Sequence, residues 1–297
     1  MPKVLVFGSM NIDYVYRVDH FVKKGETLTS KSLAVFPGGK GVNQSIAFAK
    51  AGLEVYIAGQ IGEDGRFLLE TLDAAGVNHD GVRITAEERT GNAIIQNDDA
   101  GDNCILAFPG ANFRIAEEMI DAVLVGFEAG DYLVLQNEIN SVEEIAEKAS
   151  EKGMIVVLNP SPVNERITPE LLASADWLFV NEVEAAQIVG NETDNDVLRA
   201  ALQKQFPGKH IVLTLGEQGA DYLSDGVCLH QDIFPVKVVD TTAAGDTFTG
   251  YFLAGWMRGR APQECLRLAA RASAIAVSRP GAAPSIPEAV ELSDITG

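Results

Sequence analysis

A single carboxylate follows a run of small residues in Asp240-Thr-Thr-Ala-Ala-Gly-Asp-Thr-Phe248. The small side chains of Ala243, Ala244 and Gly245 leave backbone amides accessible, and free amides at a helix start bind anions. Asp246 falls in the first turn of the helix that we expect to follow. A carboxylate there can simply stabilise the helix dipole. It can also take a proton from a hydroxyl while the amides hold a transferred phosphoryl group, which is the interpretation we favour.

A second stretch, Phe36-Pro-Gly-Gly-Lys-Gly-Val-Asn43, places three glycines around one lysine at a helix start. Glycines let the backbone approach a ligand closely. The stretch therefore suits a loop that holds a polar small molecule through Lys40, Asn43 and backbone groups, although a turn with a solvated lysine would look the same. It is not a nucleotide-binding Walker loop, because GxxxxGK[ST] is absent.

Asn11 and Asp13 come just after the first predicted strand, where open α/β sheets bind ligands. Alternation along an extended chain places both side chains on one face. A carboxylate beside an amide suits recognition of a vicinal diol, and a capping or turn pair is the alternative. Gly8 does not begin a GxGxxG sequence, so binding of a dinucleotide is poorly supported.

Two further polar segments follow predicted strands. Asn181 and Glu184 open a helix, where they are either ordinary first-turn residues or groups that orient Mg²⁺ and its waters near phosphates. The segment Thr214-Leu-Gly-Glu-Gln-Gly219 is polar and glycine-rich, and it suits nucleotide phosphates only weakly when taken alone.

Short apolar runs alternate with helical patterns and predict the elements that position these residues. We expect strands at 4–7, 55–58, 132–135, 155–158, 177–180 and 211–215, and helices at 42–51, 66–75, 142–151, 182–189, 197–205, 246–257 and 262–277. This order predicts one α/β domain over residues 1–297 with a doubly wound, mainly parallel sheet between helices. Residues 12–36 and 89–108 alternate polar and apolar and predict antiparallel strands, which must pack as a lid over a site or against another subunit.

The bulk composition excludes several classes of function. The 297 residues carry a formal charge of −19, which repels nucleic acid and anionic membranes. The HExxH and GxSxG motifs are absent, so metal-dependent and serine hydrolysis have no support. No signal-peptide pattern opens the chain and no apolar run reaches membrane-spanning length, so we expect a cytoplasmic protein.

Together these segments resemble the ribokinase-like carbohydrate kinase family over nearly the whole chain. The resemblance rests mainly on Gly38-Gly-Lys-Gly-Val-Asn43 and Asp240–Phe248, with support from Gly25-Glu-Thr27, Gly110-Ala-Asn112 and Gly281-Ala-Ala-Pro-Ser285. It implies an ATP-dependent kinase that phosphorylates a pentose, D-ribose at O5 first among the candidates. It also implies Mg²⁺, K⁺ and a homodimer that forms through the β lid.

The resemblance assigns roles residue by residue. The base would be Asp246, with an anion hole from the amides of Ala243, Ala244 and Gly245. The groups implied to hold the sugar are Asn11, Asp13, Gly39, Lys40, Asn43 and Glu138. Those implied to serve Mg²⁺ and the nucleotide are Asn181, Glu184, Thr214, Gly216 and Gly219. Those implied to surround the monovalent cation are Asp240, Thr242, Ala276, Arg279, Gly281 and Ser285.

The chain departs from the family at Ala243, where the family form is Gly-Ala-Gly-Asp. Because alanine tolerates positive φ poorly, we expect Ala243 in an ordinary backbone region with the anion hole intact. The alternatives left open are a kinase for deoxyribose, a ketohexose or a nucleoside, and a non-catalytic ligand-binding regulator with the same fold.

Overall fold

The computed structural model describes residues 1–100, 102–190 and 194–292. Its centre is a nine-stranded sheet in the order β13-β12-β11-β10-β9-β8-β1-β4-β5. Neighbouring strands pair in parallel along the part of the sheet made of β11, β10, β9, β8, β1, β4 and β5. Strands β12 and β13 add an antiparallel edge beside β11. Their bounds are β1 Val4–Phe7, β4 Val55–Gly62, β5 Asn78–Thr85, β8 Tyr132–Gln136, β9 Ile155–Asn159, β10 Trp177–Asn181, β11 His210–Thr214, β12 Ala220–Ser224 and β13 Val227–Gln231.

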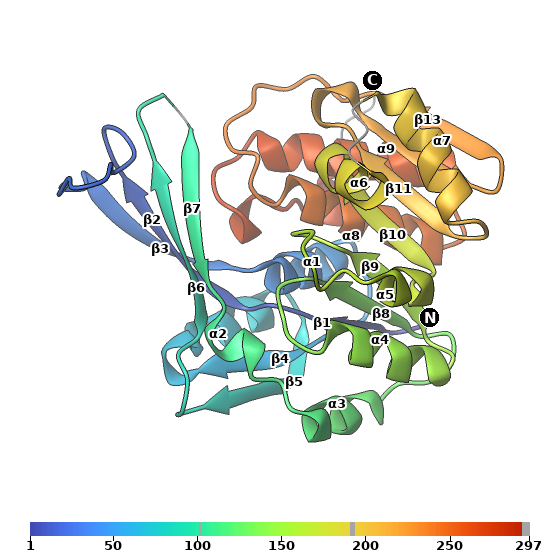
Figure 1. Cartoon of the computed structure of the whole chain (residues 1–297), viewed down its shortest axis with the longest axis horizontal. Coiled ribbons are helices and arrows are strands. Elements are labelled where there is room, and N and C mark those ends of the chain that lie inside the picture. Colours follow the sequence, from blue (N-terminus) through green and yellow to red (C-terminus); the bar gives the residue numbers. More distant parts are fainter. Residues whose placement is uncertain (101, 191–193, 293–297) are drawn as a thin grey trace.

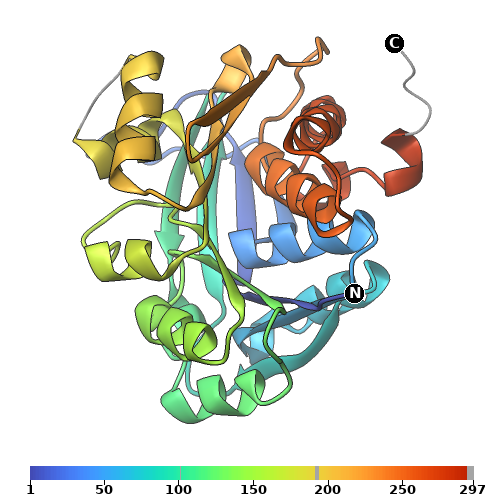
Figure 2. The same ribbon diagram turned by 90° about the vertical axis from the view of Figure 1, so that its right-hand side faces the viewer.

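Helices cover both faces of this sheet, as Figure 2 shows edge-on. On one face, α1 (Lys40–Lys50), α2 (Phe67–Ala74), α8 (Ala244–Met257) and α9 (Pro262–Val277) enclose one apolar core. On the other, α3 (Glu117–Leu124), α4 (Val142–Glu151), α5 (Pro169–Ser174), α6 (Glu182–Val189) and α7 (Asn195–Gln205) enclose a second. Single turns of 3₁₀ helix occur at Glu63–Gly65 (η1), Gly110–Phe113 (η2), Gly216–Gln218 (η3), Ala283–Ser285 (η4) and Ala289–Leu292 (η5).

A small four-stranded sheet, here called the lid, projects from one side of this body (Figure 1). It consists of β2 (Asn11–Arg17), β3 (Ser32–Gly38), β6 (Gly91–Asn97) and β7 (Asn103–Phe108). The expected antiparallel pairing occurs between β2 and β3 and between β6 and β7. The central pair, β2 and β6, is parallel instead.

The doubly wound α/β architecture predicted from the sequence is confirmed, and each predicted apolar run and helical pattern lies in or overlaps an element of that type. The predictions omitted β5, β12, β13, α3 and α5. Within the described part of the chain, no helix is both long enough and apolar enough to cross a membrane.

Candidate active site

The glycine-rich stretch before α1 packs against the link between β1 and β2. A Cβ on Gly41 would lie 2.5 Å from the carbonyl oxygen of Ser9, and one on Gly39 would lie 2.9 Å from the same atom. Gly39 also has φ 90°, a backbone region that side chains disfavour. These two glycines are therefore required for the start of α1 to approach β1.

Glu138, which follows β8, is held by both of these segments. Its Oε2 atom accepts hydrogen bonds from the Ser9 hydroxyl and, at 3.2 Å, from the backbone amide of Lys40. The Ser9 Oγ atom in turn accepts a bond of 3.3 Å from the Gly41 amide. The carboxylate is thus fixed where β1, β8 and α1 meet.

Asn11 and Asp13 lie at the start of β2 in the lid. A Cβ on Gly38 would collide with the Asp13 carboxylate, so glycine on the paired strand leaves room for that side chain. Burial, with a smaller contribution from the charge of Glu138, raises the pKa of Asp13 from 3.8 to about 6. Asn11 uses its Oδ1 atom to accept a hydrogen bond of 2.7 Å from the Asn112 amide, which leaves its own NH₂ group for another partner.

Asp246 lies in the first turn of α8 and is 7% exposed. Its Oδ2 atom accepts a hydrogen bond of 3.2 Å from the Asn43 side-chain amide, and its Oδ1 atom accepts one of 2.9 Å from Gln44. Both donors are on α1. The carboxylate is therefore oriented by the helix that also carries Lys40.

Lys40 lies within electrostatic reach of carboxylates from three other elements. Burial alone would lower the pKa of its ammonium group, but the charges of Asp246, Glu138 and Glu184 raise it above its ordinary value. Carboxylates that are far apart in the sequence therefore act electrostatically on Lys40. The structure brings the predicted base, the predicted sugar-binding loop and the start of α6 within electrostatic reach of one another.

The expectation for Ala243 is wrong. The residue adopts φ 59° and ψ 12°, in the left-handed region. The amide of Ala244 donates a 3.2 Å hydrogen bond to the carbonyl oxygen of Thr241, so Ala243 is the third residue of a tight turn. Positive φ at that position is what a type II turn requires, and the turn overrides the preference of alanine. The same bond occupies the Ala244 amide in the turn.

Asn181 and Glu184 form a capping box at the start of α6. The Asn181 Oδ1 atom accepts from the Glu184 amide at 2.8 Å, and the Glu184 Oε2 atom accepts from the Asn181 amide at 3.0 Å. Both residues therefore have a structural role as helix cap. Oε1 of Glu184 and the Asn181 NH₂ group lie outside this pair of bonds.

The next strand along the sheet brings the glycine-rich segment after β11 beside this cap. Thr214 is directly opposite Asn181 in the parallel pairing of β10 and β11. Gly216 and Gly219 both have positive φ. A Cβ on Gly219 would collide with the carbonyl oxygen of Gln231, so glycine is required there.

Asp240 joins the segment before α8 to the one after α9. Its Oδ1 atom accepts from the Thr242 amide and hydroxyl at 2.9 and 2.6 Å, and its Oδ2 atom accepts from the Gly281 amide at 2.9 Å. Burial would raise the pKa of Asp240, but these hydrogen bonds hold it below its ordinary value. Of the other predicted cation residues, Ala276 lies in the last turn of α9 and Ser285 lies on the second segment, and both are fully buried. Arg279, also on the second segment, forms an ion pair with Glu291.

The described part of the chain contains no group of three or more His, Cys, Asp or Glu side chains that could hold a metal ion.

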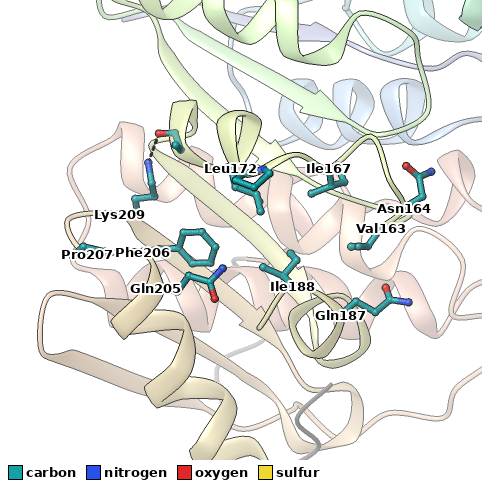
Figure 3. Close-up of a pocket in the computed structure, with 12 residues that line it drawn as sticks. Val163, Asn164, Ile167, Leu172, Gln187, Ile188, Gln205, Phe206, Pro207 and Lys209 are labelled. Carbon is teal, nitrogen blue, oxygen red and sulfur yellow. Dashed lines mark hydrogen bonds between the residues drawn. The ribbon is translucent and has the colours of Figure 1, made fainter. Parts of the chain in front are cut away.

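A pocket of about 460 Å³, separate from the predicted site, lies between α5, α6 and α7 (Figure 3). Its lining includes Ile188 and Phe206 but none of the predicted site residues.

Among the residues that the sequence reasoning did not assign, Ser9, Gln44 and Asn112 contact predicted ones through their side chains. Gln44 is adjacent to Asn43, and Asn112 ends the Gly110-Ala-Asn112 motif, so both stood beside a recognised signal. Their partners lie about 100 or more positions away, which no local pattern reveals.

The chain matches the family described as pfkB family carbohydrate kinase over residues 1–289. It therefore belongs to this family of carbohydrate kinases. Within the family it is similar to proteins named ribokinase, among them that of Haemophilus influenzae, with 34% identity over 97% of this chain and 96% of the relative.

Solved structures of ribokinases agree with this comparison. The ribokinase of Thermotoga maritima superposes with a TM-score of 0.88 at 35% identity, covering 99% of this chain and 98% of the other. The Arabidopsis thaliana ribokinase complexed with ribose and ATP gives a TM-score of 0.89 at 31% identity, covering 99% of each chain. The expected membership of the ribokinase-like kinases is thus confirmed.

Proposed function

We propose that this protein is an ATP-dependent ribose kinase that forms ribose 5-phosphate. The observation that carries the proposal is the position of Asp246 at the start of α8, hydrogen-bonded to Asn43 and electrostatically coupled to Lys40. A base, a sugar-binding helix start and a helix N-terminus suited to phosphate meet there. The relative that binds ribose and ATP has the same fold over nearly its whole length.

The sugar would bind between the lid and α1. Asp13 and Glu138 can accept hydrogen bonds from sugar hydroxyls, and Asn11 presents an NH₂ donor. The Asn43 Oδ1 atom is buried and has no hydrogen-bond partner among the described residues, so a hydroxyl of the sugar can satisfy it. The remaining sugar contacts are assigned to Gly39 and Lys40, which lie at the same helix start.

In the reaction, Asp246 takes the proton of the 5-hydroxyl as that oxygen attacks the γ-phosphorus of ATP. The bond between this phosphorus and the oxygen bridging to the β-phosphate breaks, and ADP leaves with its electron pair. The Ala244 amide is used by the turn, so we assign the stabilisation of the transferred phosphoryl group to the amides of Ala243 and Gly245 at the start of α8 and to Lys40. A Cβ on Gly245 would meet nothing within 4 Å, so glycine keeps open the space beside the base.

The nucleotide would lie along the ends of β10 and β11. Thr214, Gly216 and Gly219 supply polar groups and a backbone that can approach phosphates closely. Oε1 of Glu184, which lies outside the capping box, can accept hydrogen bonds from the waters of a magnesium ion, and the free Asn181 NH₂ group can donate to a phosphate oxygen. Such an ion supplies positive charge to the phosphates when bound.

We also assign a monovalent cation, K⁺, to the paired segments around Asp240 and Gly281. The hydrogen bond between Asp240 and the Gly281 amide holds the two segments next to each other. Carbonyl and carboxylate oxygens suit a hard cation of low charge. Replacing KCl by tetramethylammonium chloride at constant ionic strength should lower kcat, and an unchanged rate would remove this assignment.

We propose a homodimer in which the lid covers the partner's lid. Leu33, Val35, Ile94 and Leu106 are all between 38% and 69% exposed. The strand pairing places them on one face, opposite to the face that carries Asp13. An apolar face of this kind on a projecting sheet indicates a protein interface. Analytical ultracentrifugation should give a dimer for the native chain and a monomer for Leu106→Asp; a monomeric native chain would refute it.

We propose that the enzyme lies in the cytoplasm, where ATP is available. All three cysteines are free thiols, as expected in a reducing compartment: Cys104, Cys228 and Cys265.

A coupled assay of ADP release with a panel of sugars and nucleosides tests the proposal. Ribose should give the highest kcat/KM, and ³¹P NMR should place the phosphate on O5. A higher kcat/KM for deoxyribose, a ketohexose or a nucleoside would contradict the assignment of ribose. Thermal stabilisation by a sugar without any ADP release would instead indicate a binding protein.

A further inference from the structure

Gln44 is the residue in contact with Asp246 to which no role has been given. It lies on α1 next to Asn43 and is fully buried. Its Nε2 atom donates to Asp246 Oδ1 at 2.9 Å and to Asn159 Oδ1 at 3.1 Å. Its Oε1 atom accepts a 2.7 Å bond from the side-chain amide of Gln136, which ends β8. Both amide hydrogens and the oxygen are thus engaged.

The direction of these hydrogen bonds is fixed at both ends. An ionised carboxylate can only accept, so Gln44 must present its NH₂ group to Asp246. Asn159 must present its oxygen, because its own NH₂ group donates to the carbonyl oxygen of Phe179 at 2.8 Å. The Gln44 oxygen then faces Gln136, whose NH₂ group satisfies it. A reversed Gln44 amide would place two acceptors together at Asp246 and again at Asn159.

The backbones of α1 and α8 hold this contact at a fixed separation. A Cβ on Gly250 would lie 2.5 Å from the Cβ of Ala47, so the two helices approach as closely as glycine permits. Gly250 is one helical turn beyond Asp246. Ala47 is one turn beyond Asn43 and three residues beyond Gln44. The close approach therefore lies directly beside the hydrogen bonds to the carboxylate.

We propose that Gln44 is a positioning residue: its amide, oriented by Gln136 and Asn159, holds the Asp246 carboxylate in the rotamer that accepts the substrate proton. This inference rests on the proposed role of Asp246 as base. In the proposed arrangement, the Oδ1 atom of Asp246 keeps its hydrogen bond to Gln44. The Oδ2 atom, whose hydrogen bond to Asn43 is longer, faces the sugar hydroxyl. Gln44 itself touches neither the sugar nor the nucleotide.

Gln44→Glu is the most informative variant, because it keeps the size of the side chain and replaces the donor by a second carboxyl group. Two carboxyl groups in contact share a proton, so the base becomes available only at higher pH. We expect the acidic limb of the kcat–pH profile to move up by about 1 to 2 pH units, with kcat recovering toward the native value in alkaline buffer. A profile unchanged in position would overturn the proposal, since a purely structural defect lowers kcat at every pH.

Gln44→Met removes the donor without adding charge. We expect kcat to fall about 10- to 100-fold, the range for loss of one hydrogen bond to a charged group, while the equilibrium affinity for ribose stays nearly constant. A loss of ribose affinity with unchanged kcat would contradict a positioning role. The matched control is Gln203→Met on α7, whose amide also makes two hydrogen bonds, to Ser224 and Val227, but on the opposite face of the sheet. It should leave both quantities unchanged.

Two further variants separate the possible failures. If Gln44→Met does not fold, Gln136→Met removes only the group that orients Gln44, and it should lower kcat with the same constancy of ribose affinity. In an Asp246→Asn background, Gln44→Met should no longer change the residual rate, because its effect passes through the carboxylate. An equal additional loss there would overturn the positioning role while leaving Asp246 as base. Absence of sugar kinase activity in the native chain would instead refute the proposed function.

Discussion

Replacing Asp13 by asparagine should stabilise the folded protein near neutral pH, although it removes a proposed sugar ligand. The carboxylate of Asp13 is desolvated in the lid and lies near the charge of Glu138, and together these effects raise its pKa from 3.8 to about 6. At neutral pH the folded protein therefore keeps a charge in a place that disfavours it. Asparagine has nearly the same shape and no charge.

The size of this effect follows from the two pKa values. Each pKa unit corresponds to about 1.4 kcal/mol, so ionising Asp13 costs the folded state at most about 3 kcal/mol. The partial exposure of the side chain and the polarity of the new amide reduce the gain, and we expect about 1 to 2 kcal/mol. Between pH 6 and pH 3.8 the folded protein binds a proton at Asp13 that the unfolded chain does not. The cost therefore shrinks as pH falls through this window and is absent below it.

The assay is thermal unfolding of the ligand-free native protein and Asp13→Asn at pH 7.5 and at pH 5. The melting temperature of the variant should exceed that of the native protein at pH 7.5, and the difference should be smaller at pH 5. Asp102→Asn, at an exposed position on the lid, is the control and should show no such pH-dependent difference. A variant that is less stable at pH 7.5, or a gain of equal size at both pH values, would refute the reasoning.

Three other predictions concern the sugar site and the helix that carries the base. The KM for ribose should rise about tenfold per pH unit as pH falls below 6, because protonated Asp13 loses an acceptor, and Asp13→Asn should abolish this dependence; a native KM independent of pH between 5 and 7 would contradict it. Ala243→Gly should keep kcat and raise the unfolding free energy by about 0.5 kcal/mol, because glycine adopts φ 59° without strain; a lower melting temperature would argue against strain at this position. Gly250→Ala should destabilise the protein by about 1 to 3 kcal/mol and lower kcat, because its Cβ would press on Ala47; unchanged calorimetric stability would show that α1 and α8 can separate freely.

The sequence predicted the elements whose residues carry a strong periodic signal. The buried parallel strands are apolar on both faces, and the longer helices repeat with a clear period, so both were recognised. β5 was missed because it is an edge strand whose side chains are all exposed or only partly buried, so Asn78–Thr85 has no continuous apolar run. α5 was missed because six residues from Pro169 to Ser174 are too few to show a helical period.

The site was predictable as a set of segments but not as a set of contacts. The glycines around Lys40 and the small residues before Asp246 are local signals. The orientation of the Gln44 side-chain amide depends on Gln136 and Asn159, which only the folded sheet brings to α1.

The prediction for Ala243 failed because a local preference was outweighed by the surrounding structure. Alanine disfavours positive φ, so we predicted an ordinary backbone conformation, but the hydrogen-bonded turn from Thr241 to Ala244 imposes positive φ on this residue. A local preference of about 1 to 2 kcal/mol is smaller than what the surrounding structure can impose.

The most direct test of Asp246 as the catalytic base is the turnover of Asp246→Asn with ribose and ATP. The variant keeps the size of the side chain but loses its negative charge and the ability to take a proton. General base catalysis contributes about 10²- to 10⁴-fold, so kcat should fall by at least that factor. The affinity for ribose, measured by calorimetry without ATP, should stay within a few-fold of the native value. Near-normal turnover in this variant would contradict the account.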